Sequence, residues 1–537
     1  MGDKPIVLMP EDVQRILGKD AQRNNILAAK MVSEIVKTTL GPKGMDKMLV
    51  SPTGDIVVTN DGVTILDEMQ IEHPAAKMMV EIAKTQEVEV GDGTTTAVMI
   101  AGKLLENAEK LLDKKIHPTV ITKGYRLAAE KCQEILMDLA LRITSQEEDV
   151  LRQIAMTAMT GKGAEDSKEK FADIIVKAVK QVQKEGKIDI DDIKIEKSKG
   201  EGIKDTELIS GIVLDKEKVS QDMPEKIEGA KIALVDFPVE LKNPEIETKI
   251  SISTPEQLQS FLHEEEKTIK DMIEKIKFSG ANVLFCQKGI DDFAQYLLAK
   301  EEIYACRRVA KSDMEKLAKA TGAKIVSNLG ELTPFELGNA NLVEEVKHGE
   351  DTLTYIRGCQ NPKALTILIH GGTSHILDEV ERALKDGLGD VICSLKHGLV
   401  VPGGGAIEIE VAKRLREFSQ ELSGREQLAV EEFASALEFI PATLAENGGL
   451  DPIDVLTELK SKHDSGEKNA GLNLFTNKVE NVLEAKIIEP LKIKTQAISS
   501  ASEVAIMILR IDDVIASGGK GMPRGGGMSR NPYGDMD

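Results

Sequence analysis

Hydrophobic residues recur at helical spacing through the first third of the chain. Residues 24–40 (NNILAAKMVSEIVKTTL) predict a helix that ends before Gly41-Pro42. Its apolar positions fall near one helical face: Ile26, Leu27, Met31, Val32, Ile35 and Val36. Long helical patterns follow between Pro74 and Leu141, so we expect this part of the chain to be mainly helical.

Residues 48–59 (MLVSPTGDIVVT) interrupt the helical patterns with two β-rich runs around a Pro/Gly turn. This arrangement predicts a short hairpin. The hairpin either belongs to a meander within the chain, which is the commoner case, or pairs with the edge of another chain.

Alternation replaces helical spacing between about Lys187 and Lys218, where KIDIDDIKIEKS and TELISGIVLD predict strands. From Ala230 onward, short apolar runs alternate with helical patterns. This succession predicts a parallel sheet in a separate domain.

Residues 241–280 interrupt that succession with strand-like ETKISIS and then a charged helical pattern. Its apolar positions are spaced for one face: Leu258, Phe261, Leu262 and Ile269. We expect either a solvated surface helix or a mobile protrusion with a functional apolar stripe.

After Lys363 a buried-type strand (ALTILI), a long helix and a second strand with a Gly-rich loop (LVVPGGG) lead back to helical patterns. AIMILRIDDVIA predicts a terminal strand, and the Gly/Met/Arg-rich tail from Ser517 is typical of disorder. Helical patterns at both ends around an α/β centre indicate nested domains, one of them closed by the two termini.

Composition narrows the class of protein. The chain has 537 residues, enough for about three or four domains, and 41% hydrophobic residues. Its net charge of −21 disfavours nucleic acid or an anionic membrane as the main ligand. We find neither an apolar run long enough for a membrane span nor a secretory signal. Five scattered cysteines and no H-E-x-x-H motif favour reduced thiols in a cytosolic protein without a zinc site.

The familiar nucleotide motifs are missing. Every Gly-Lys pair lacks a following Ser or Thr, so the chain has no Walker A loop, and no G-x-G-x-x-G opens a helix after a strand. The kinase motifs are missing too.

Other segments nevertheless have the chemistry of phosphate binding. In the stretch Gly91-Asp92-Gly93-Thr94-Thr95-Thr96, glycine backbone and a helix N-terminus offer N–H groups to an anion, and Asp92 offers a carboxylate to Mg²⁺. The same stretch also suits an ordinary turn with a helix N-cap, and both interpretations stay open.

Further glycines and carboxylates could join such a site. Thr39–Gly44 (TLGPKG) and Gly403-Gly404-Gly405 offer exposed backbone, although tight packing explains the three glycines equally well. Asp61 and Asp386 could orient or deprotonate a water beside Mg²⁺. Spacing alone does not distinguish Asp386 from its neighbour Asp390.

Ten segments in order resemble a group II chaperonin: LGPKGMDKML, NDGVTIL, IEHPAAKM, GDGTTTAV, DTELISGIVLDKE, CQKGIDD, VPGGGAIE, GREQLA, LAEN-GLDPID and ILRIDDVIA. The resemblance runs from about Met9 to Ser517 and is strongest to the archaeal members, the thermosome subunits. The eukaryotic cytosolic members are the near alternative.

The resemblance implies a multidomain α+β and α/β fold. A mainly helical equatorial domain would bind ATP and comprise residues 1–147 and 403–537, with a disordered tail at 517–537. A small α/β intermediate hinge domain would comprise 148–217 and 369–402. An α/β apical domain at 218–368 would bind unfolded protein and carry a helical lid protrusion at about 241–277.

The resemblance also implies the roles of individual residues. Asp92 would bind Mg²⁺, Asp61 would lie near the attacking water, Asp386 would drive hydrolysis, and Lys162 would sense the γ-phosphate. The remaining nucleotide contacts would come from Leu40, Gly41, Pro42, Gly93, Thr94, Thr95, Thr96, Thr160, Gly161, Gly404, Asn473 and Glu489.

A subunit of this kind would use ATP/ADP and Mg²⁺ and would assemble with identical or paralogous subunits in stacked rings of eight or nine. It would enclose unfolded client proteins in the cytoplasm with a built-in lid and no separate lid protein, without nucleic acid or membrane. Two other classes remain: a small-molecule kinase or metabolic ATPase using the same loops, and a purely structural ring or filament protein.

The chain departs from the family pattern at four positions. Gly387 and Gly448 stand where alanine is usual, Ala158 stands where serine is common, and Pro402 precedes the three glycines. None of these changes removes a functional side chain. Gly387 lies inside a predicted helix and could loosen the placement of Asp386 by up to about 1 kcal/mol of helix propensity.

Overall fold

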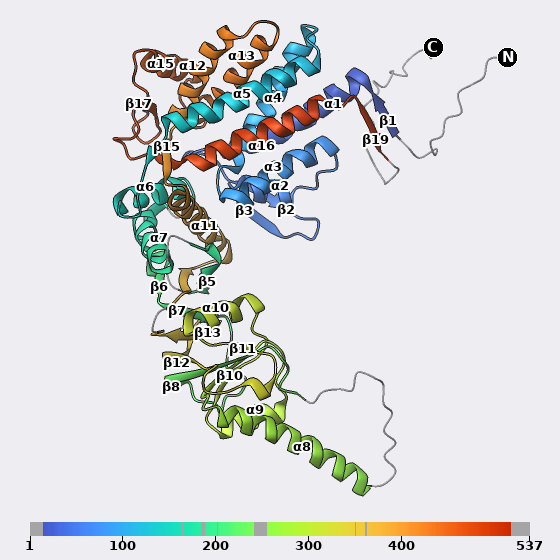
Figure 1. Ribbon diagram of the computed structural model, residues 1–537, viewed down its shortest axis with the longest axis vertical. Coiled ribbons are helices and arrows are strands. Elements are labelled where there is room, and N and C mark those ends of the chain that lie inside the picture. Colours follow the sequence, from blue (N-terminus) through green and yellow to red (C-terminus); the bar gives the residue numbers. More distant parts are fainter. Residues whose placement is uncertain are drawn as a thin grey trace, which may run out of the picture. The chain divides into compact units, whose positions relative to one another are not determined.

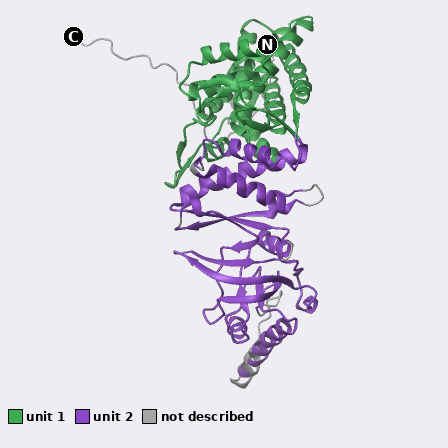
Figure 2. Cartoon of the chain, turned by 90° about the vertical axis from the view of Figure 1, so that its left-hand side faces the viewer, with its two compact units in different colours: residues 1–142, 399–537 green, residues 143–398 purple. Residues whose placement is uncertain are grey.

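Two units make up the chain in the computed structural model (Figure 2). Unit 1 combines residues 1–142 and 399–537, so both ends of the chain contribute to it, and unit 2 comprises residues 143–398. The structure describes residues 14–163, 165–183, 188–200, 202–240, 255–349, 351–359 and 362–516. The finer division into equatorial, intermediate and apical domains remains a prediction.

Unit 1 is mainly helical (Figure 1). Its helices are α1 (Gly18–Lys37), α2 (Gly62–Glu68), α3 (Pro74–Val90), α4 (Thr94–Asp113), α5 (Pro118–Leu139), α12 (Ala406–Glu421), α13 (Glu426–Leu437), α14 (Phe439–Asn447), α15 (Pro452–Asp464) and α16 (Leu491–Leu509). Helix α4 packs among α1, α3, α13 and α16. From Thr94 to Gly102 it carries only apolar or small residues and is buried on nearly all sides, whereas its second half has a charged, partly exposed side. A Cβ atom on Gly102 of α4 would lie 2.3 Å from Cβ of Ser33, which shows how closely α1 approaches.

Short strands complete unit 1. They are β1 (Gln14–Leu17), β2 (Lys47–Val50), β3 (Ile56–Thr59), β4 (Leu141–Arg142), β15 (Leu399–Pro402), β16 (Ala470–Asn473), β17 (Lys478–Asn481), β18 (Ile488–Pro490) and β19 (Asp513–Ala516). Strands β2 and β3 form the predicted hairpin as a two-stranded sheet of its own, so the internal-meander alternative is wrong for the described residues. Strands β1 and β19 join the two chain ends in another two-stranded sheet.

Unit 2 begins with a layer of helices on a small sheet. Its helices are α6 (Glu148–Met159), α7 (Lys168–Val182) and α11 (Ser374–His397), and its strands are β5 (Ile193–Lys199), β14 (Leu365–Gly371) and β6 (Glu207–Ile209), in the order β5-β14-β6. Strand β14 is wholly buried and pairs in parallel with β5, which lies far from it in sequence.

The larger sheet of unit 2 is mixed, so the prediction of a parallel sheet is only partly right. Its strands run in the order β10 (Tyr304–Cys306), β9 (Val283–Cys286), β8 (Lys226–Val235), β12 (Gly338–His348), β13 (Asp351–Arg357) and β7 (Gly211–Leu214), with β11 (Ile325–Val326) also on β8. The α/β succession forms the parallel pairs. The long pair β12 and β13, which the sequence pattern did not predict, adds antiparallel neighbours.

Helices α9 (Asp292–Lys300) and α10 (Lys311–Thr321) follow strands of this sheet.

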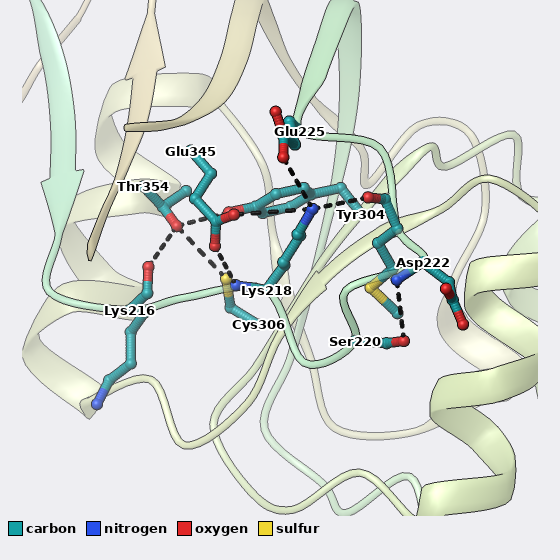
Figure 3. A network of polar contacts seen from close by, with 10 residues as sticks. Lys216, Lys218, Ser220, Asp222, Glu225, Tyr304, Cys306, Glu345 and Thr354 are labelled. Carbon is teal, nitrogen blue, oxygen red and sulfur yellow. Dashed lines mark hydrogen bonds and ion pairs between the residues drawn. The ribbon is translucent and has the colours of Figure 1, made fainter. Parts of the chain in front are cut away.

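A polar network lies beside the large sheet (Figure 3). The Tyr304 hydroxyl donates to Thr354 Oγ1 at 2.6 Å, because that oxygen already donates its own proton to the Lys216 carbonyl. The Lys218 backbone N–H donates to the Glu345 carboxylate at 2.9 Å. These bonds tie the segment after β7 to strands β10, β12 and β13.

The predicted protrusion is described only from its helix onward. Helix α8 (Pro255–Phe278) covers most of the charged helical pattern. Ile269, Ile273 and Ile276 in its second half are buried in the core beside the large sheet, so this half is packed. Residues 241–254, including the strand-like segment, and the side chains of Leu258, Phe261 and Leu262 lie outside the described residues, as does the tail from residue 517.

Two sequence-based predictions about helices are wrong in detail. Leu27 and Met31 are more than half exposed, because α1 buries a narrower stripe that contains Ile26, Val32 and Val36. The segment AIMILRIDDVIA is not one strand: residues up to Leu509 continue α16, and only Asp513–Ala516 forms β19. An apolar run of this length suits a buried helix as well as a strand.

All five cysteine side chains are buried as thiols. Across the described residues, no helix is both long and apolar enough to cross a membrane.

A buried ion pair fastens α15 to α12 in unit 1. Glu410 lies 2.9 Å from His463 Nδ1 and accepts from Arg414 Nε at 3.0 Å, while His463 Nε2 donates to the Ala470 carbonyl at 2.8 Å. Burial alone would raise the pKa of Glu410, but the bonds from His463 and Arg414 outweigh it and lower the pKa.

We expect Glu410→Gln to lower the free energy of unfolding by about 3 kcal/mol near pH 7, because it removes one partner of a buried pair. A lowered pKa stabilises the fold above the unfolded-state pKa of about 4.3, and this contribution is lost as the pH falls through the folded-state pKa. Guanidinium unfolding at pH 7 and at pH 4 should therefore show a smaller difference between variant and parent at the lower pH. The control Glu458→Gln removes an exposed pair with Lys462 and should change stability by less than about 1 kcal/mol; an equal effect of both variants would contradict this assignment.

Candidate functional site

The Gly91–Thr96 stretch forms the turn between α3 and α4. Gly91 and Gly93 both have positive φ angles, and a Cβ atom on Gly93 would lie 2.5 Å from Ile493 Cγ2. The buried Gln86 amide donates to the carbonyls of Asp92 (2.8 Å) and Ile493 (3.3 Å) and so ties this turn to α16. Glycine is required at position 93 by both conformation and space.

Three threonines begin α4 directly after that turn. The backbone N–H groups of a first helical turn have no partner within the helix, so they are suited to an anion. Thr94 and Thr96 are buried, and Thr95 is half-buried. The stretch is thus a turn and a helix start, and its geometry also fits the phosphate-binding interpretation.

Asp61 lies beside the same helix start. It caps α2 by accepting from the Thr64 backbone N–H at 2.8 Å, and its other carboxylate oxygen accepts from Thr94 Oγ1 at 3.4 Å. A Cβ atom on Gly62 would lie 2.7 Å from Thr95 Oγ1. The structure therefore brings the Asp61 turn and the Thr94–Thr96 turn into contact.

The Leu40-Gly41-Pro42 turn follows α1, which ends at Lys37. Asn447 of α14 donates to the Lys37 and Leu40 carbonyls at 3.0 and 2.9 Å, and thereby satisfies backbone groups at the end of α1. Gly41 has a φ of 83°, and a Cβ atom there would lie 2.4 Å from Leu444. The turn is held by packing against α14.

The three glycines 403–405 lie against neighbouring backbone. The Leu472 N–H donates to the Gly404 carbonyl at 2.8 Å, and a Cβ atom on Gly404 would lie 2.8 Å from the Leu472 carbonyl oxygen. A Cβ atom on Gly403 would lie 2.6 Å from Glu489 Oε1. Tight packing accordingly explains these glycines, and it also places the Glu489 carboxylate on their loop.

Asn473 ends β16 next to this loop and is buried. Its amide donates to Glu480 at 2.6 Å, and its oxygen accepts from the Phe475 backbone at 2.9 Å. The following turn reaches the loop after α1, because Lys43 Nζ donates to Asn477 at 2.8 Å. A chain of contacts therefore links the predicted site residues of unit 1.

The remaining predicted site residues belong to unit 2. Thr160 and Gly161 follow α6, where Thr160 Oγ1 donates to the Met156 carbonyl at 2.6 Å and Gly161 has a φ of 80°. Lys162 forms an ion pair with Asp386 of α11. The structure thus brings these two predicted residues together within unit 2.

Asp386 and Asp390, one helical turn apart, differ in environment. Asp386 pairs with Lys162 and is 9% exposed, whereas Asp390 is only 2% exposed. Asp386, the less buried of the two carboxylates, is the better candidate for a group that meets solvent or a ligand.

Sequence reasoning missed four polar residues around the unit 1 site: Gln86, Glu408, Asn447 and Lys494. The sequence does contain a signal for the two charged residues, Glu408 and Lys494. Glu408 is one of two glutamates in AIEIEV and Lys494 is one of two lysines in LKIKTQAI, both mostly apolar helical segments. A charge at a buried helical position requires a partner.

Comparison with known proteins identifies the family to which this chain belongs. A family model described as the TCP-1/cpn60 chaperonin family matches residues 32–518. A thermosome subunit of Methanopyrus kandleri is 57% identical over 518 residues, which are 96% of this chain and 95% of that protein. Thermosome subunit beta of Archaeoglobus fulgidus is 56% identical over 528 residues, 98% of this chain and 97% of that protein.

One solved structure agrees with these relatives. The open-state monomer of a group II chaperonin from Methanococcoides burtonii has a TM-score of 0.59 and 49% identity, and the match covers 79% of this chain and 100% of that one. The multidomain α+β fold is accordingly that of a chaperonin. The chain belongs to the TCP-1/cpn60 chaperonin family, and its relatives confirm the resemblance to group II members.

The structure explains two departures from the family pattern by packing. A Cβ atom on Gly387 would lie 2.7 Å from Cδ1 of the buried Ile175 and 3.4 Å from Met159 Cγ, so Ile175 occupies the space. A Cβ atom on Gly448 would lie 2.5 Å from Leu474 Cδ2. Nothing in the structure explains Ala158 or Pro402 specifically.

We expect Gly387→Ala to leave stability unchanged or to lower it, because crowding of Ile175 opposes a gain of about 1 kcal/mol in helix propensity. In an Ile175→Val background, which removes the Cδ1 atom, the same change should raise stability by about 1 kcal/mol. Denaturant unfolding of the four proteins in this double-mutant cycle measures the coupling. Equal effects of Gly387→Ala in both backgrounds would show that Ile175 does not select glycine.

Proposed function

We propose that this chain is an ATP-hydrolysing subunit of a double-ring chaperonin that encloses unfolded proteins. Membership of the group II chaperonins supports the class of activity. The observation that carries the nucleotide site is the contact chain in unit 1. It joins the start of α4 to the Asp61 turn and to α16, and α16 in turn contacts Glu489 at the three-glycine loop. A bond from Lys43 to Asn477 joins the turn after α1 to the segment beside that loop.

The residues of unit 1 fit a nucleotide with its magnesium ion. Backbone N–H groups of Thr94, Thr95 and Thr96 at the start of α4 would bind phosphate oxygens, and Asp92 would offer a carboxylate to Mg²⁺. Bound Mg²⁺ would neutralise charge that develops on the phosphate oxygens.

The other predicted contacts follow from where each residue lies. Leu40, Gly41, Pro42, Gly93 and Gly404 would expose backbone to the nucleotide. Asn473 and Glu489 would bound the ribose and base, because both lie at the three-glycine loop.

The residues of unit 2 would couple the nucleotide to hydrolysis. We propose that Thr160, Gly161 and Lys162 meet the nucleotide and that Lys162 responds to the γ-phosphate. Asp386 would orient the attacking water together with Asp61. The ion pair between Lys162 and Asp386 supports this proposal, because a change at either residue acts directly on the other.

The proposed partners are identical or paralogous subunits in stacked rings and unfolded client proteins, in the cytoplasm and without a separate lid protein. A small-molecule kinase or metabolic ATPase is the second candidate. It requires a further substrate, so hydrolysis of ATP by the purified protein alone, altered by added denatured protein, would exclude it.

We propose that two short sheets of unit 1 form the contact between neighbouring subunits. The β2–β3 hairpin exposes apolar side chains, among them Met48 (66%) and Val50 (64%), and Ile515 of the β1–β19 pair is 56% exposed. Two-stranded sheets leave backbone groups at their edges, which favour pairing with another strand. We propose that the hairpin pairs with the β1–β19 sheet of a neighbouring copy.

We expect Asp386→Asn to reduce the rate of ATP hydrolysis by about a hundredfold or more, because an amide cannot accept a proton from water. ADP binding should stay within about threefold of the parent. Steady-state phosphate release and calorimetric titration measure the two quantities. In the matched variant Asp390→Asn, the rate of ATP hydrolysis per folded ring should stay near that of the parent. If only the Asp390→Asn variant lost hydrolysis, Asp390 and not Asp386 would be the hydrolytic aspartate.

We expect Met48→Lys with Val50→Lys to shift the protein from rings to smaller species, because two charges would be buried at the proposed edge. Light scattering after size-exclusion chromatography measures the mass, and circular dichroism checks that the subunit still folds. Met137→Lys changes another methionine that is more than half exposed, in α5, and should leave the rings intact. Intact rings with the doubly substituted hairpin would refute this interface.

A further inference from the structure

Three charged side chains meet behind the three-glycine loop of unit 1. Lys494 Nζ of α16 lies 2.9 Å from Glu408 Oε1 of α12 and 2.5 Å from Glu489 Oε2 of β18. The group carries one net negative charge when all three side chains are ionised. It combines the first turns of two helices with a strand that pairs with β15.

Burial differs sharply across this group. The side chains of Glu408 and Lys494 are 3% and 9% exposed, whereas that of Glu489 keeps 23%. Glu489 also places its other oxygen, Oε1, against Gly403 of the loop. Glu489 can therefore meet a ligand, while Glu408 and Lys494 lie behind it.

Lys494 determines whether Glu489 is ionised. Burial raises the pKa of Glu489, Lys494 opposes this rise, and the negative charges of Glu408 and Asp92 add to it. Burial would lower the pKa of Lys494, but the two carboxylates outweigh it and raise that pKa. Lys494 stays charged as a consequence, and it is the group that favours an ionised Glu489.

The same helix start is fastened to the phosphate-binding turn. Ile493, the residue before Lys494, contacts Gly93, and the Gln86 amide joins the carbonyls of Ile493 and Asp92. A shift of Lys494 would consequently disturb both ends of the proposed nucleotide site.

Stability does not by itself account for this group. Apolar residues of similar volume commonly replace a buried ion group at no cost in stability, or with a gain. A lysine between two carboxylates has a purpose when one of them must stay charged and fixed at a surface that meets a ligand.

We propose that Lys494 is a positioning residue that holds the Glu489 carboxylate over the three-glycine loop for the nucleotide ribose, with Glu408 as the counter-charge that fixes Lys494. The inference rests on the proposed function, since it assumes that a nucleotide binds at this loop. Glu489 makes the contact with ligand, and Lys494 acts through it.

The test measures ADP binding to the assembled full-length protein by isothermal titration calorimetry between pH 6 and pH 8.5. Lys494→Met leaves two carboxylates without their cation. We expect affinity for ADP to fall by roughly tenfold or more at pH 8 and to recover towards pH 6, because the carboxylate pair then takes up one proton. The parent should vary by less than about threefold over the same range.

The double variant Glu408→Gln with Lys494→Met restores the net charge of the group and offers Glu489 an amide donor. We expect its affinity for ADP to return to within about threefold of the parent at pH 8. Lys492→Met removes a lysine of the same helical turn that bonds to Gln496, and it should leave ADP binding unchanged.

The outcomes separate the two proposals. No ADP binding by the parent protein would contradict the proposed function itself. If the parent binds ADP, then unchanged or pH-independent binding by Lys494→Met, or a double variant as weak as the single one, would overturn the positioning role. If Lys494→Met does not fold, the double variant still decides the question. ADP binding by the double variant near that of the parent supports the positioning role, and weak binding overturns it.

Discussion

Close backbone approach at the start of α4 is the constraint on which unit 1 depends. The first half of α4 is buried on nearly all sides, so the N–H groups of its first turn must meet polar partners or a ligand. Gly93 lies against Ile493, Gly62 lies against Thr95, and the Gln86 amide satisfies carbonyls of two segments. A side chain at either glycine would separate the elements that shape the proposed phosphate site.

Helix α12 connects this site with the stability of the unit. Glu408 faces Lys494 and Glu489, whereas Glu410 faces His463 and Arg414. Both glutamates are nearly inaccessible, and each has a partner from another element: Lys494 of α16 for Glu408 and His463 of α15 for Glu410. The Glu408 group lies at the proposed nucleotide site and the Glu410 group fastens α15, so a single helix carries both a structural buried charge and one with a proposed role in ligand binding.

Unit 2 has a comparable arrangement around the residues proposed for hydrolysis. Lys162 follows α6 and Asp386 lies in α11, two helices that pack together, and Gly387 allows Ile175 of α7 to fill the space beside them. The glycine that looks like a loosened helix in the sequence is instead a matched packing partner. The placement of Asp386 therefore depends on three helices rather than on local propensity.

The sequence by itself determined the elements whose signals are local. Helices α3, α4 and α5, the β2–β3 hairpin, the parallel part of the large sheet and the glycine turns all follow from periodicity and turn residues. The ordered motifs also determined the family. Tertiary structure alone decided the antiparallel strands β12 and β13, the exposure of Leu27 and Met31, and the helical end of α16, because short apolar runs suit either state until neighbours cover them. It also decided which charges meet: Lys494 with Glu408 and Glu489, and Lys162 with Asp386. Glu408 and Lys494, and likewise Lys162 and Asp386, are far apart in sequence, and only the fold brings them within ion-pair distance of one another.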